Sequence, residues 1–443
     1  MNINSLNKKR KKIFNNIFYK NKFYVKKKLL FIVIFLLICQ EEMINYGFIN
    51  VGYYCNSLKN GGVERVMSLL INYLSKERKF NHFLITNEGK SKGDYLIDQN
   101  IKRISLWEEK LTLKEAIKKN TIDILIYNFY DQTEINELNK LKKTKIICYD
   151  HSSYFFWIYQ NIFNFKDSVY NGYKNCKYVI SLIPFENDYL FKKWGINSIL
   201  MDNPATFEYD SVVPSDLKNK NIIMIGRAFD TFKRFDLGII AMKSIIKEIP
   251  KCEMNILSFS VKNLEILIQN LNLEKHVRFV GFQKNLKIFL QNSSLHILPS
   301  ISESYSMALS EAKIYGIPSI IIGLDYLSLA KGGTIIIYDD DPHVIAKEAI
   351  KILKNDYYRK MLGKEARKSM KNHKNSLIIQ KWINLLFSIQ KGNKPSFPKE
   401  LEPNIISEKE AKKILNNQLN LFKRRIPLLR QITIEKLINF SII

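Results

Sequence analysis

The chain has 443 residues, of which 46% are hydrophobic and 12% aromatic. This composition excludes a disordered chain, and the length suits two or three domains with separate cores. The formal net charge of +27 comes from 69 Lys and Arg against 42 Asp and Glu. It has two candidate origins: a general bias towards Lys, Asn and Ile, or attraction to anionic lipids and polyanionic substrates. The basic residues are spread out and no reader motif is present, so we expect no nucleic-acid partner.

The first 42 residues form an N-terminal extension. Residues 1–28 hold ten Lys or Arg and no acidic residue, and an apolar run follows from Leu29 to Cys39. This run is shorter than the about 20 residues that span a bilayer, and no small-residue cleavage site follows it. Three interpretations remain: a short membrane anchor or interfacial segment, an over-extended start before a true Met43, or an additional buried strand or helix.

From residue 43 onwards, strand-like and helical patterns alternate, which favours βαβ units and parallel sheets. Residues 43–207 are interpreted as a first Rossmann-like domain. Its predicted strands lie at 48–54, 83–86, 124–127, 145–148, 178–182 and 199–201, and its predicted helices at 63–75 and 184–193. Residues 208–220 are polar and contain a Pro, so we expect a linker there.

Residues 221–390 repeat the alternation and are interpreted as a second Rossmann-like domain. Its predicted strands lie at 222–225, 253–257, 277–280, 295–298, 319–322 and 334–337, and its predicted helices at 235–247, 342–354, 356–371 and 376–389. Residues 391–443 read as a Lys-rich, Pro-containing tail. The fold class is therefore α/β, with two doubly wound sheets that bind ligands at the carboxyl ends of their strands.

The first motif is the pair Gly61-Gly62, which follows the first predicted strand. Paired glycines let the backbone approach a ligand closely and leave amides free at a helix start. A purely structural turn is the alternative. The second motif places Arg227 where a strand ends and Lys233 just before the next helix. Two fixed cations at such a point suit a diphosphate, and a solvated loop in a Lys-rich chain is the alternative.

The third motif is a pair of carboxylates, Glu303 and Glu311, with seven residues between them. Glu303 lies in a Ser-rich loop after a predicted strand, and Glu311 lies two turns along the helix that follows. A strand, a loop of small residues and a helix N-terminus together suit an anion such as a diphosphate. Carboxylates at both ends can accept hydrogen bonds from sugar hydroxyls, which indicates a nucleotide-sugar pocket.

In this order and spacing, the motifs resemble those of the family 4 retaining glycosyltransferases, also called group 1, over residues 47–390. The resemblance implies the GT-B fold, in which two Rossmann-like domains face each other across a cleft lined by Gly61 and Gly62. It implies that Arg227 and Lys233 grip the donor diphosphate, that Glu303 lies near the donor sugar and that Glu311 binds the ribose. The residues implied to supply phosphate-binding amides are Tyr305, Ser306, Met307, Ala308 and Leu309.

The resemblance also suggests a catalytic role for His151, which follows a predicted strand in the first domain; a capping or packing role is the alternative. Many members have Gly-Phe-Gly where this chain has Ser304-Tyr305-Ser306. We therefore expect donor choice to be determined there. Residues 154–165 hold seven aromatics, which predicts either a packed core or a patch that touches a membrane or a lipid-linked acceptor.

The resulting prediction is a retaining glycosyltransferase that uses a nucleoside-diphosphate sugar as donor and a growing surface glycan as acceptor, with lipid-linked glycans among the candidates. It needs no cofactor and no metal, because the two cations replace the metal, and Asp339-Asp340-Asp341 is interpreted as a helix cap. The protein is expected in the cytoplasm, peripheral to or anchored at the inner face of the cytoplasmic membrane. A GT-B sugar-nucleotide epimerase and a non-catalytic scaffold of a glycan assembly complex are the alternatives.

Overall fold

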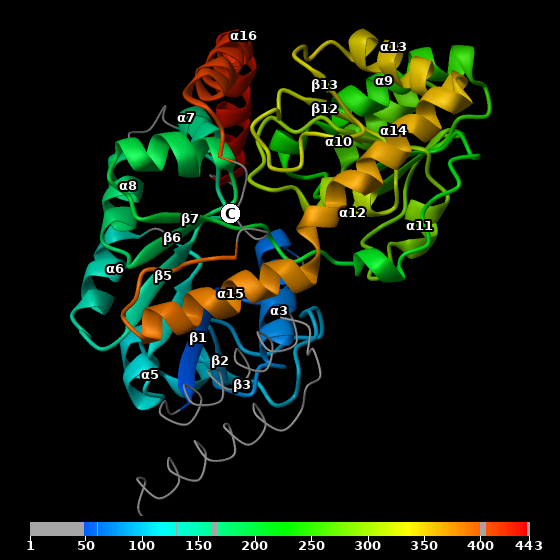
Figure 1. Ribbon diagram of the computed structural model, residues 1–443. Coiled ribbons are helices and arrows are strands. Elements are labelled where there is room, and N and C mark those ends of the chain that lie inside the picture. Colours follow the sequence, from blue (N-terminus) through cyan, green and yellow to red (C-terminus); the bar gives the residue numbers. More distant parts are fainter. Residues whose placement is uncertain (1–47, 60, 130, 161–165, 399–404, 441–443) are drawn as a thin grey trace, which may run out of the picture. The chain divides into compact units, whose positions relative to one another are not determined.

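The computed structural model describes residues 48–59, 61–129, 131–160, 166–398 and 405–440 (Figure 1). The residues from Ile49 onwards form one compact unit. The N-terminal extension of residues 1–42 lies outside the described residues, so its three interpretations stay open. Within the described part of the chain, no helix combines the length and the apolar character that a membrane span requires.

The first half contains a sheet of seven parallel strands in the order β3-β2-β1-β4-β5-β6-β7. The strands are β1 (Ile49–Cys55), β2 (Phe80–Thr86), β3 (Lys102–Ser105), β4 (Ile124–Tyr127), β5 (Lys145–Tyr149), β6 (Tyr178–Ser181) and β7 (Ser198–Leu200). The helices are α3 (Gly62–Leu74), α4 (Leu106–Glu109), α5 (Leu113–Lys119), α6 (Gln132–Asn139), α7 (Tyr154–Gln160), α8 (Lys166–Lys174) and the π-helix η2 (Glu186–Phe191). The strand order reverses between β1 and β4.

The second half contains a sheet of six parallel strands in the order β10-β9-β8-β11-β12-β13, and its order reverses between β8 and β11. The strands are β8 (Ile222–Ile225), β9 (Met254–Leu257), β10 (Val277–Phe279), β11 (Leu295–Leu298), β12 (Ser319–Ile322) and β13 (Thr334–Ile337). The helices are α9 (Phe235–Glu248), α10 (Lys262–Asn270), α11 (Lys287–Gln291), α12 (Met307–Ile314), α13 (Pro342–Lys354), α14 (Asp356–Ser369), α15 (Asn375–Gln390) and α16 (Glu408–Phe440). Short 3-10 turns are η3 (Tyr209–Ser211), η4 (Thr231–Lys233) and η5 (Met370–His373).

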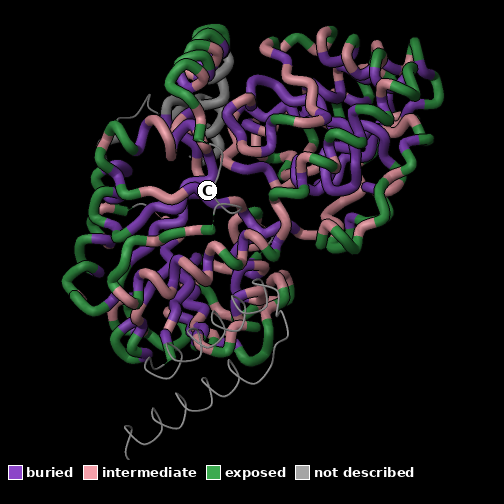
Figure 2. The backbone as a smooth tube through the Cα atoms, viewed as in Figure 1, coloured by how far each residue is buried: buried purple, intermediate pink, exposed green. Residues whose placement is uncertain are grey.

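Burial explains why these segments are strands. Strands β4, β6, β9, β11 and β12 are buried at every position, and Figure 2 shows buried backbone running through the sheets. Parallel strands covered by helices on both faces read as continuous apolar runs, which is why most strands were predicted from the sequence. The α/β fold class with two parallel sheets is confirmed.

Strand β3 was missed by the sequence analysis. It is a short edge strand with the sequence Lys-Arg-Ile-Ser, exposed at its first residue and buried only in its second half. The helix cap predicted at Asp341 is confirmed, because its carboxylate accepts a hydrogen bond from the His343 N–H at 2.8 Å. Pro342 follows as the first residue of α13, where the lack of an N–H costs nothing.

Helix α15 corrects the predicted domain boundary at residue 390. Its side chains pack against the first half: Trp382 lies edge-on to Tyr149 with ring centroids 5.2 Å apart, and Phe387 lies 5.0 Å from Phe80. Asn375 at its start donates a hydrogen bond to the Tyr73 hydroxyl at 2.8 Å. The apolar period of a helix predicts the helix but not the sheet it covers, so sequence continuity assigned α15 to the wrong half.

The predicted tail of residues 391–443 is also corrected, since most of it is the long helix α16. Ala411, Ile414 and Leu421 of this helix are buried. The helix was not recognised because Lys, Arg and Asn residues and Pro427 interrupt its apolar pattern. In the aromatic segment after residue 153, Phe155 and Trp157 are buried, whereas Tyr154 and Phe156 are partly exposed. The side chains of residues 158–165 lie outside the described set, so both interpretations of the segment stay open.

The packing of α15 gives a stability prediction. Replacing the fully buried Trp382 with Ala is expected to lower the free energy of unfolding by about 3–5 kcal/mol, because a large cavity is left. Urea unfolding followed by circular dichroism measures this change. Trp382→Phe is the matched control and should cost much less, since the indole N–H has no hydrogen-bond partner among the described residues. An unchanged midpoint for Trp382→Ala would contradict the packing.

Candidate functional site

Loops that follow the strands carry the predicted site residues, and β1, β8 and β11 among these strands lie at the order reversals. Gly61 and Gly62 come after β1, and His151 comes directly after β5. Arg227 follows β8, and Glu303 lies in the loop between β11 and α12. Because parallel strands end at the same edge of their sheet, these loops collect at the carboxyl edges, where doubly wound sheets bind ligands.

A cavity of about 670 Å³ is lined by residues of both halves of the chain. It brings together all but one of the predicted site residues. Those that line it are Gly61, Gly62, His151, Arg227, Lys233, Glu303, Tyr305, Ser306, Met307, Ala308 and Glu311. The exception is Leu309, whose side chain is fully buried and whose N–H donates to the Ser306 hydroxyl at 3.3 Å. The Leu309 amide is therefore already used as part of a helix cap.

Lys233 and Glu303 form the central charged pair of this cavity. The Lys233 Nζ lies 2.7 Å from the Glu303 Oε1, and both side chains are largely buried. The Ser300 hydroxyl donates to the same carboxylate oxygen at 2.7 Å. The Glu303 N–H donates to the Tyr326 hydroxyl at 3.2 Å, which fixes the backbone. The pair thus presents an oriented cation and an oriented carboxylate at one place.

Arg227 lines the cavity but stands apart from this pair. Its guanidinium lies 3.5 Å from the Asp230 carboxylate and above the Phe229 ring. The side chain is 53% exposed, so its position is less firmly fixed than that of the Lys233 side chain. Its predicted grip on a diphosphate stays a prediction.

Glu311 is a buried carboxylate held from the other half of the chain. Its Oε1 accepts hydrogen bonds from the Arg65 guanidinium at 2.8 Å and from the Thr206 hydroxyl at 2.7 Å. Its Oε2 is buried and has no hydrogen-bond partner within the described residues. Burial raises the pKa of Glu311, and Arg65 opposes this rise. A buried acceptor without a partner is costly, so the free oxygen marks a place for a ligand donor.

Arg65 and Thr206 were missed as site residues. Arg65 belongs to the Gly-Gly motif, but nothing in the sequence links it to a carboxylate 246 residues away. Thr206 lies 105 residues before Glu311 and belongs to no motif. The available signal was the position of Arg65 in the first turn of a helix that begins at the Gly-Gly loop.

His151 is held as a neutral imidazole of defined tautomer. The Asn128 amide nitrogen donates to the Tyr54 carbonyl at 2.8 Å, which turns the Asn128 oxygen towards His151. The His151 Nε2 lies 2.8 Å from that oxygen and therefore carries the proton. Its Nδ1 is left as an acceptor. Burial lowers the pKa of His151 to about 3, so the ring is neutral at physiological pH.

The Gly-Gly loop approaches the cavity closely. A Cβ atom at Gly61 would lie 1.7 Å from the Glu64 Oε2, whereas a Cβ at Gly62 would meet nothing within 4 Å. A side chain at Gly61 would therefore have to displace the Glu64 carboxylate, whereas the space around Gly62 is open. Burial raises the pKa of Glu64, which also lines the cavity.

Ser306 occupies a backbone conformation that favours glycine. Its φ of +65° lies in the left-handed region, which costs a residue with a Cβ atom about 1–2 kcal/mol. Its hydroxyl caps helix α12 by accepting the hydrogen bond from Leu309. Ser306 therefore adopts a backbone conformation that favours glycine, the residue expected at this position from the resemblance to group 1. Its side chain also provides a helix cap that glycine lacks.

Aromatic and hydroxyl groups form the remaining wall. Phe156 and Phe232 contact each other with ring centroids 5.7 Å apart, and both line the cavity. The hydroxyls of Ser153 and Ser302 lie 2.6 Å apart and join the two halves beside Glu303. Such a mixed wall suits a sugar, which has apolar ring faces and polar edges. Across the described ranges, no group of three or more His, Cys, Asp or Glu side chains is arranged to hold a metal ion.

Comparison with known proteins gives consistent matches. Residues 206–369 match the family described as "Glycosyl transferases group 1". An uncharacterized glycosyltransferase of Haemophilus influenzae is 23% identical over 297 residues, covering 61% of this chain and 79% of that protein. A Campylobacter jejuni alpha-1,4-N-acetyl-D-galactosaminyltransferase, named for an undecaprenol-diphosphate-linked glycan, is 22% identical over 361 residues, with 77% and 99% covered. The crystal structure of Anabaena HepE in complex with UDP and glucose has a TM-score of 0.63 at 15% identity and covers 77% of this chain and 100% of that one.

The geometry of His151 gives a prediction that needs no ligand. In nitrogen NMR spectra, His151 is expected to stay neutral and Nε2-protonated from pH 8 down to about pH 5, because its pKa lies near 3. Asn128→Asp should raise the pKa, since a carboxylate beside Nε2 favours the imidazolium. Exposed His343 serves as the internal reference for the histidine signals. Titration of His151 near pH 6.5 would contradict the burial of its ring.

Proposed function

We propose that this chain, a group 1 glycosyltransferase of GT-B fold, is a retaining enzyme that extends a lipid-linked surface glycan from a nucleoside-diphosphate sugar. The observation that carries this proposal is one cavity that holds an oriented Lys233–Glu303 pair and a buried, unpartnered oxygen of Glu311. A diphosphate offers negative charge to the first, and a ribose offers hydroxyl donors to the second. A nucleotide sugar satisfies both at once.

The proposed mechanism is electrostatic. Lys233, aided by Arg227, neutralises the diphosphate as it leaves, and the first turn of α12 adds backbone N–H groups that have no partner within the helix. Glu303 accepts hydrogen bonds from the donor sugar and orients it. Because these cations supply the positive charge, we propose that transfer requires no metal ion and no cofactor beyond the donor.

Retention of configuration follows in this proposal if the acceptor attacks from the face that the diphosphate leaves. The anomeric carbon then loses its bond to the diphosphate oxygen and gains one to the acceptor oxygen on the same face. The departing phosphate takes the acceptor proton, so no protein nucleophile is needed. The Nδ1 of neutral His151 accepts a hydrogen bond from a sugar hydroxyl and positions the reacting centre.

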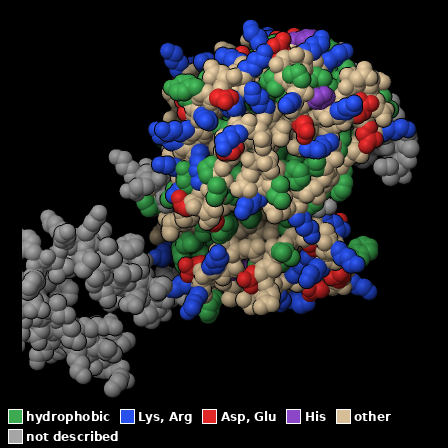
Figure 3. Space-filling view, turned by 90° about the vertical axis from the view of Figure 1, so that its right-hand side faces the viewer, with side chains coloured by type: hydrophobic (Ala, Val, Ile, Leu, Met, Phe, Trp, Pro, Cys, Tyr) green, Lys and Arg blue, Asp and Glu red, His purple; other side chains and the backbone are tan. Residues whose placement is uncertain are grey.

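The acceptor is proposed from two supporting observations. The Campylobacter jejuni relative acts, by its name, on an undecaprenol-diphosphate-linked glycan. The net charge of +27 favours an anionic membrane surface. This attraction would come from the whole surface, since Figure 3 shows Lys and Arg spread over the visible face rather than gathered in one patch. We therefore propose that the enzyme works at the inner face of the cytoplasmic membrane.

Two alternatives are distinguished by product. A GT-B epimerase converts a nucleotide sugar without any acceptor, and a scaffold binds one without turnover. The oriented Lys233–Glu303 pair favours transfer, because a scaffold has no need to hold a buried cation and carboxylate at the reacting end of the donor.

The direct test is a thermal-shift screen of nucleoside-diphosphate sugars followed by a transfer assay on lipid-linked glycans. Lys233→Ala is expected to lower kcat by about 10²–10³, the usual effect of losing one oriented group that stabilises developing charge. Glu303→Ala should have a similar effect. Exposed Lys247→Ala is the matched control and should leave transfer unchanged. Near-normal turnover in both site variants would contradict the assignment of the site. Loss of activity in EDTA and its recovery with Mn²⁺ would contradict the proposal that transfer needs no metal ion.

The Arg65–Glu311 pair gives a pH prediction. Glu311 must be ionised for Oε2 to accept from ribose hydroxyls, and Arg65 opposes the burial that raises the Glu311 pKa. Nucleoside-diphosphate binding should therefore weaken as pH falls through that pKa. In Arg65→Met the pKa rises further, so binding is expected to be lost at a higher pH and partly regained in alkali.

Calorimetric titration between pH 5 and 9 measures this shift. The control is Arg78→Met, which changes an exposed arginine on the segment after α3. This variant is expected to keep the pH profile of the unaltered protein. Superimposable profiles for Arg65→Met and the unaltered protein would show that Arg65 does not hold the charge of Glu311.

A further inference from the structure

We propose that the C-terminal helix α16 supports the donor site by holding the loop that carries Glu303, with Arg425 as the positioning residue. The proposal rests on the proposed function, because it gives Glu303 its role at the donor sugar. The matched family region ends at residue 369, so α16 is an addition beyond it.

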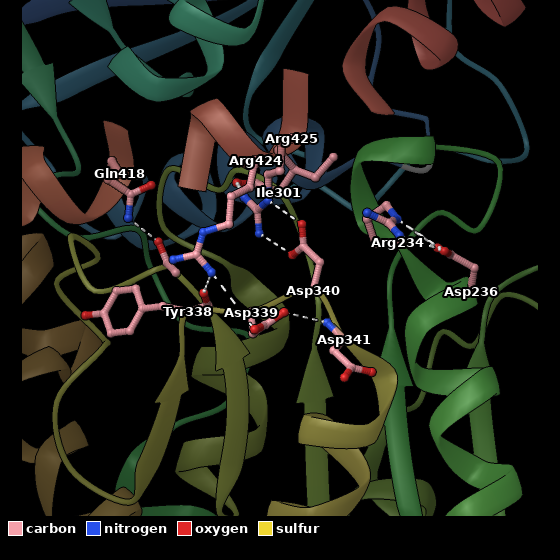
Figure 4. Close-up of polar contacts among 11 residues, drawn as sticks. Arg234, Asp236, Ile301, Tyr338, Asp339, Asp340, Asp341, Gln418, Arg424 and Arg425 are labelled. Atoms are coloured by element: carbon pink, nitrogen blue, oxygen red, sulfur yellow. Dashed lines mark hydrogen bonds and ion pairs between the residues drawn. The ribbon is translucent and has the colours of Figure 1, made fainter. Parts of the chain in front are cut away.

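Arg425 connects two loops at the carboxyl edge of the second sheet (Figure 4). Its Nε and Nη2 donate to the two oxygens of Asp340 at 2.8 and 2.7 Å, a bidentate pair. Its Nη1 donates to the Ile301 carbonyl at 3.2 Å. Asp340 follows β13, and Ile301 lies two residues before Glu303. One guanidinium therefore ties the Glu303 loop, which follows β11, to the loop that follows β13, two strands away in the same sheet.

The burial of Arg425 shows that this contact is specific. Its side chain is 1% exposed, whereas the neighbouring Arg424 is 61% exposed and lies 3.9 Å from Asp339. Burying a guanidinium is costly unless its donors are paired with good geometry. A helix that only covered apolar surface would have no need of it. The bidentate fork fixes direction as well as distance, which suits a positioning role.

A second path from α16 reaches Glu303 through the segment after β12. Gln418 of α16 is buried and donates to the Asp325 carboxylate at 2.9 Å and to the Gly323 carbonyl. Gly323 has a φ of +60°, and a Cβ there would lie 2.1 Å from the Leu421 Cδ1. This segment carries Tyr326, whose hydroxyl accepts the hydrogen bond from the Glu303 N–H.

The two paths hold the backbone on both sides of Ser302, the residue before Glu303. Arg425 holds the carbonyl of Ile301, and the segment that Gln418 anchors holds the N–H of Glu303. Helix α16 touches neither Lys233 nor Glu311 in any described contact. We therefore expect it to affect recognition of the donor sugar and to leave recognition of the nucleoside diphosphate intact.

The test is the ratio of two dissociation constants, for the donor found in the screen and for its nucleoside diphosphate alone. This ratio does not depend on the fraction of folded protein, so a purely stabilising role would not move it. Arg425→Met is expected to lower the preference for the sugar-bearing ligand by about tenfold, as expected when a contact group is slightly misplaced. The dissociation constant of the diphosphate should change by less than about twofold.

Two further variants complete the design. Arg424→Met is the matched control, because it removes the adjacent exposed arginine, and it should keep the unaltered ratio. Gln418→Leu tests the second path and serves in place of Arg425→Met if that variant does not fold; it should also lower the ratio. Arg425→Lys, which keeps the charge but loses the fork, should recover little.

The outcomes separate the two proposals. An unaltered ratio in both Arg425→Met and Gln418→Leu would overturn the role of α16 and reduce it to a stabilising helix. If the unaltered protein binds neither ligand in the screen, the proposed function fails instead, together with the inference that rests on it. If it binds both ligands but transfers no sugar, the ratio still decides the role of α16.

Discussion

A buried carboxylate that is only half satisfied organises this molecule. Glu311 is held on one oxygen by Arg65 and Thr206, while its other oxygen has no partner in the described chain. The ion pair joins the first helix after β1 to α12 in the second half. Burial raises the pKa of Glu311, and the Arg65 guanidinium opposes that rise. In the proposed function a ribose hydroxyl is the missing partner, so structure and donor binding would depend on the same group.

The remaining charges of the cavity follow the same logic. Lys233 and Glu303 neutralise each other at 2.7 Å, so neither is buried unpaired, and each is available for exchange with a charged or hydroxylated ligand. His151 is kept neutral and turned by Asn128 so that it presents an acceptor. In the proposed mechanism the protein supplies charge and orientation rather than a nucleophile, and electrostatic preorganisation lowers the barrier.

The sequence predicted the parts of this arrangement that are local. Strands such as β8 and β11, and the sequence positions of Gly61, Lys233 and Glu303, follow from apolar runs and motif spacing. Contacts between distant segments could not be predicted, because no local pattern records them: Arg65 with Glu311, Trp382 with Tyr149, and Arg425 with Asp340. Helix α16 was missed because Lys, Arg and Asn residues and Pro427 interrupt its apolar pattern.

The central claim is that the free oxygen of Glu311 binds the nucleoside part of a nucleotide sugar. Calorimetry of a nucleoside diphosphate with the Glu311→Gln variant tests it most directly, because the change keeps shape and removes charge. The account predicts an affinity at least about tenfold weaker, since hydrogen bonds to a charged acceptor are lost. An affinity equal to that of the unaltered protein would contradict it.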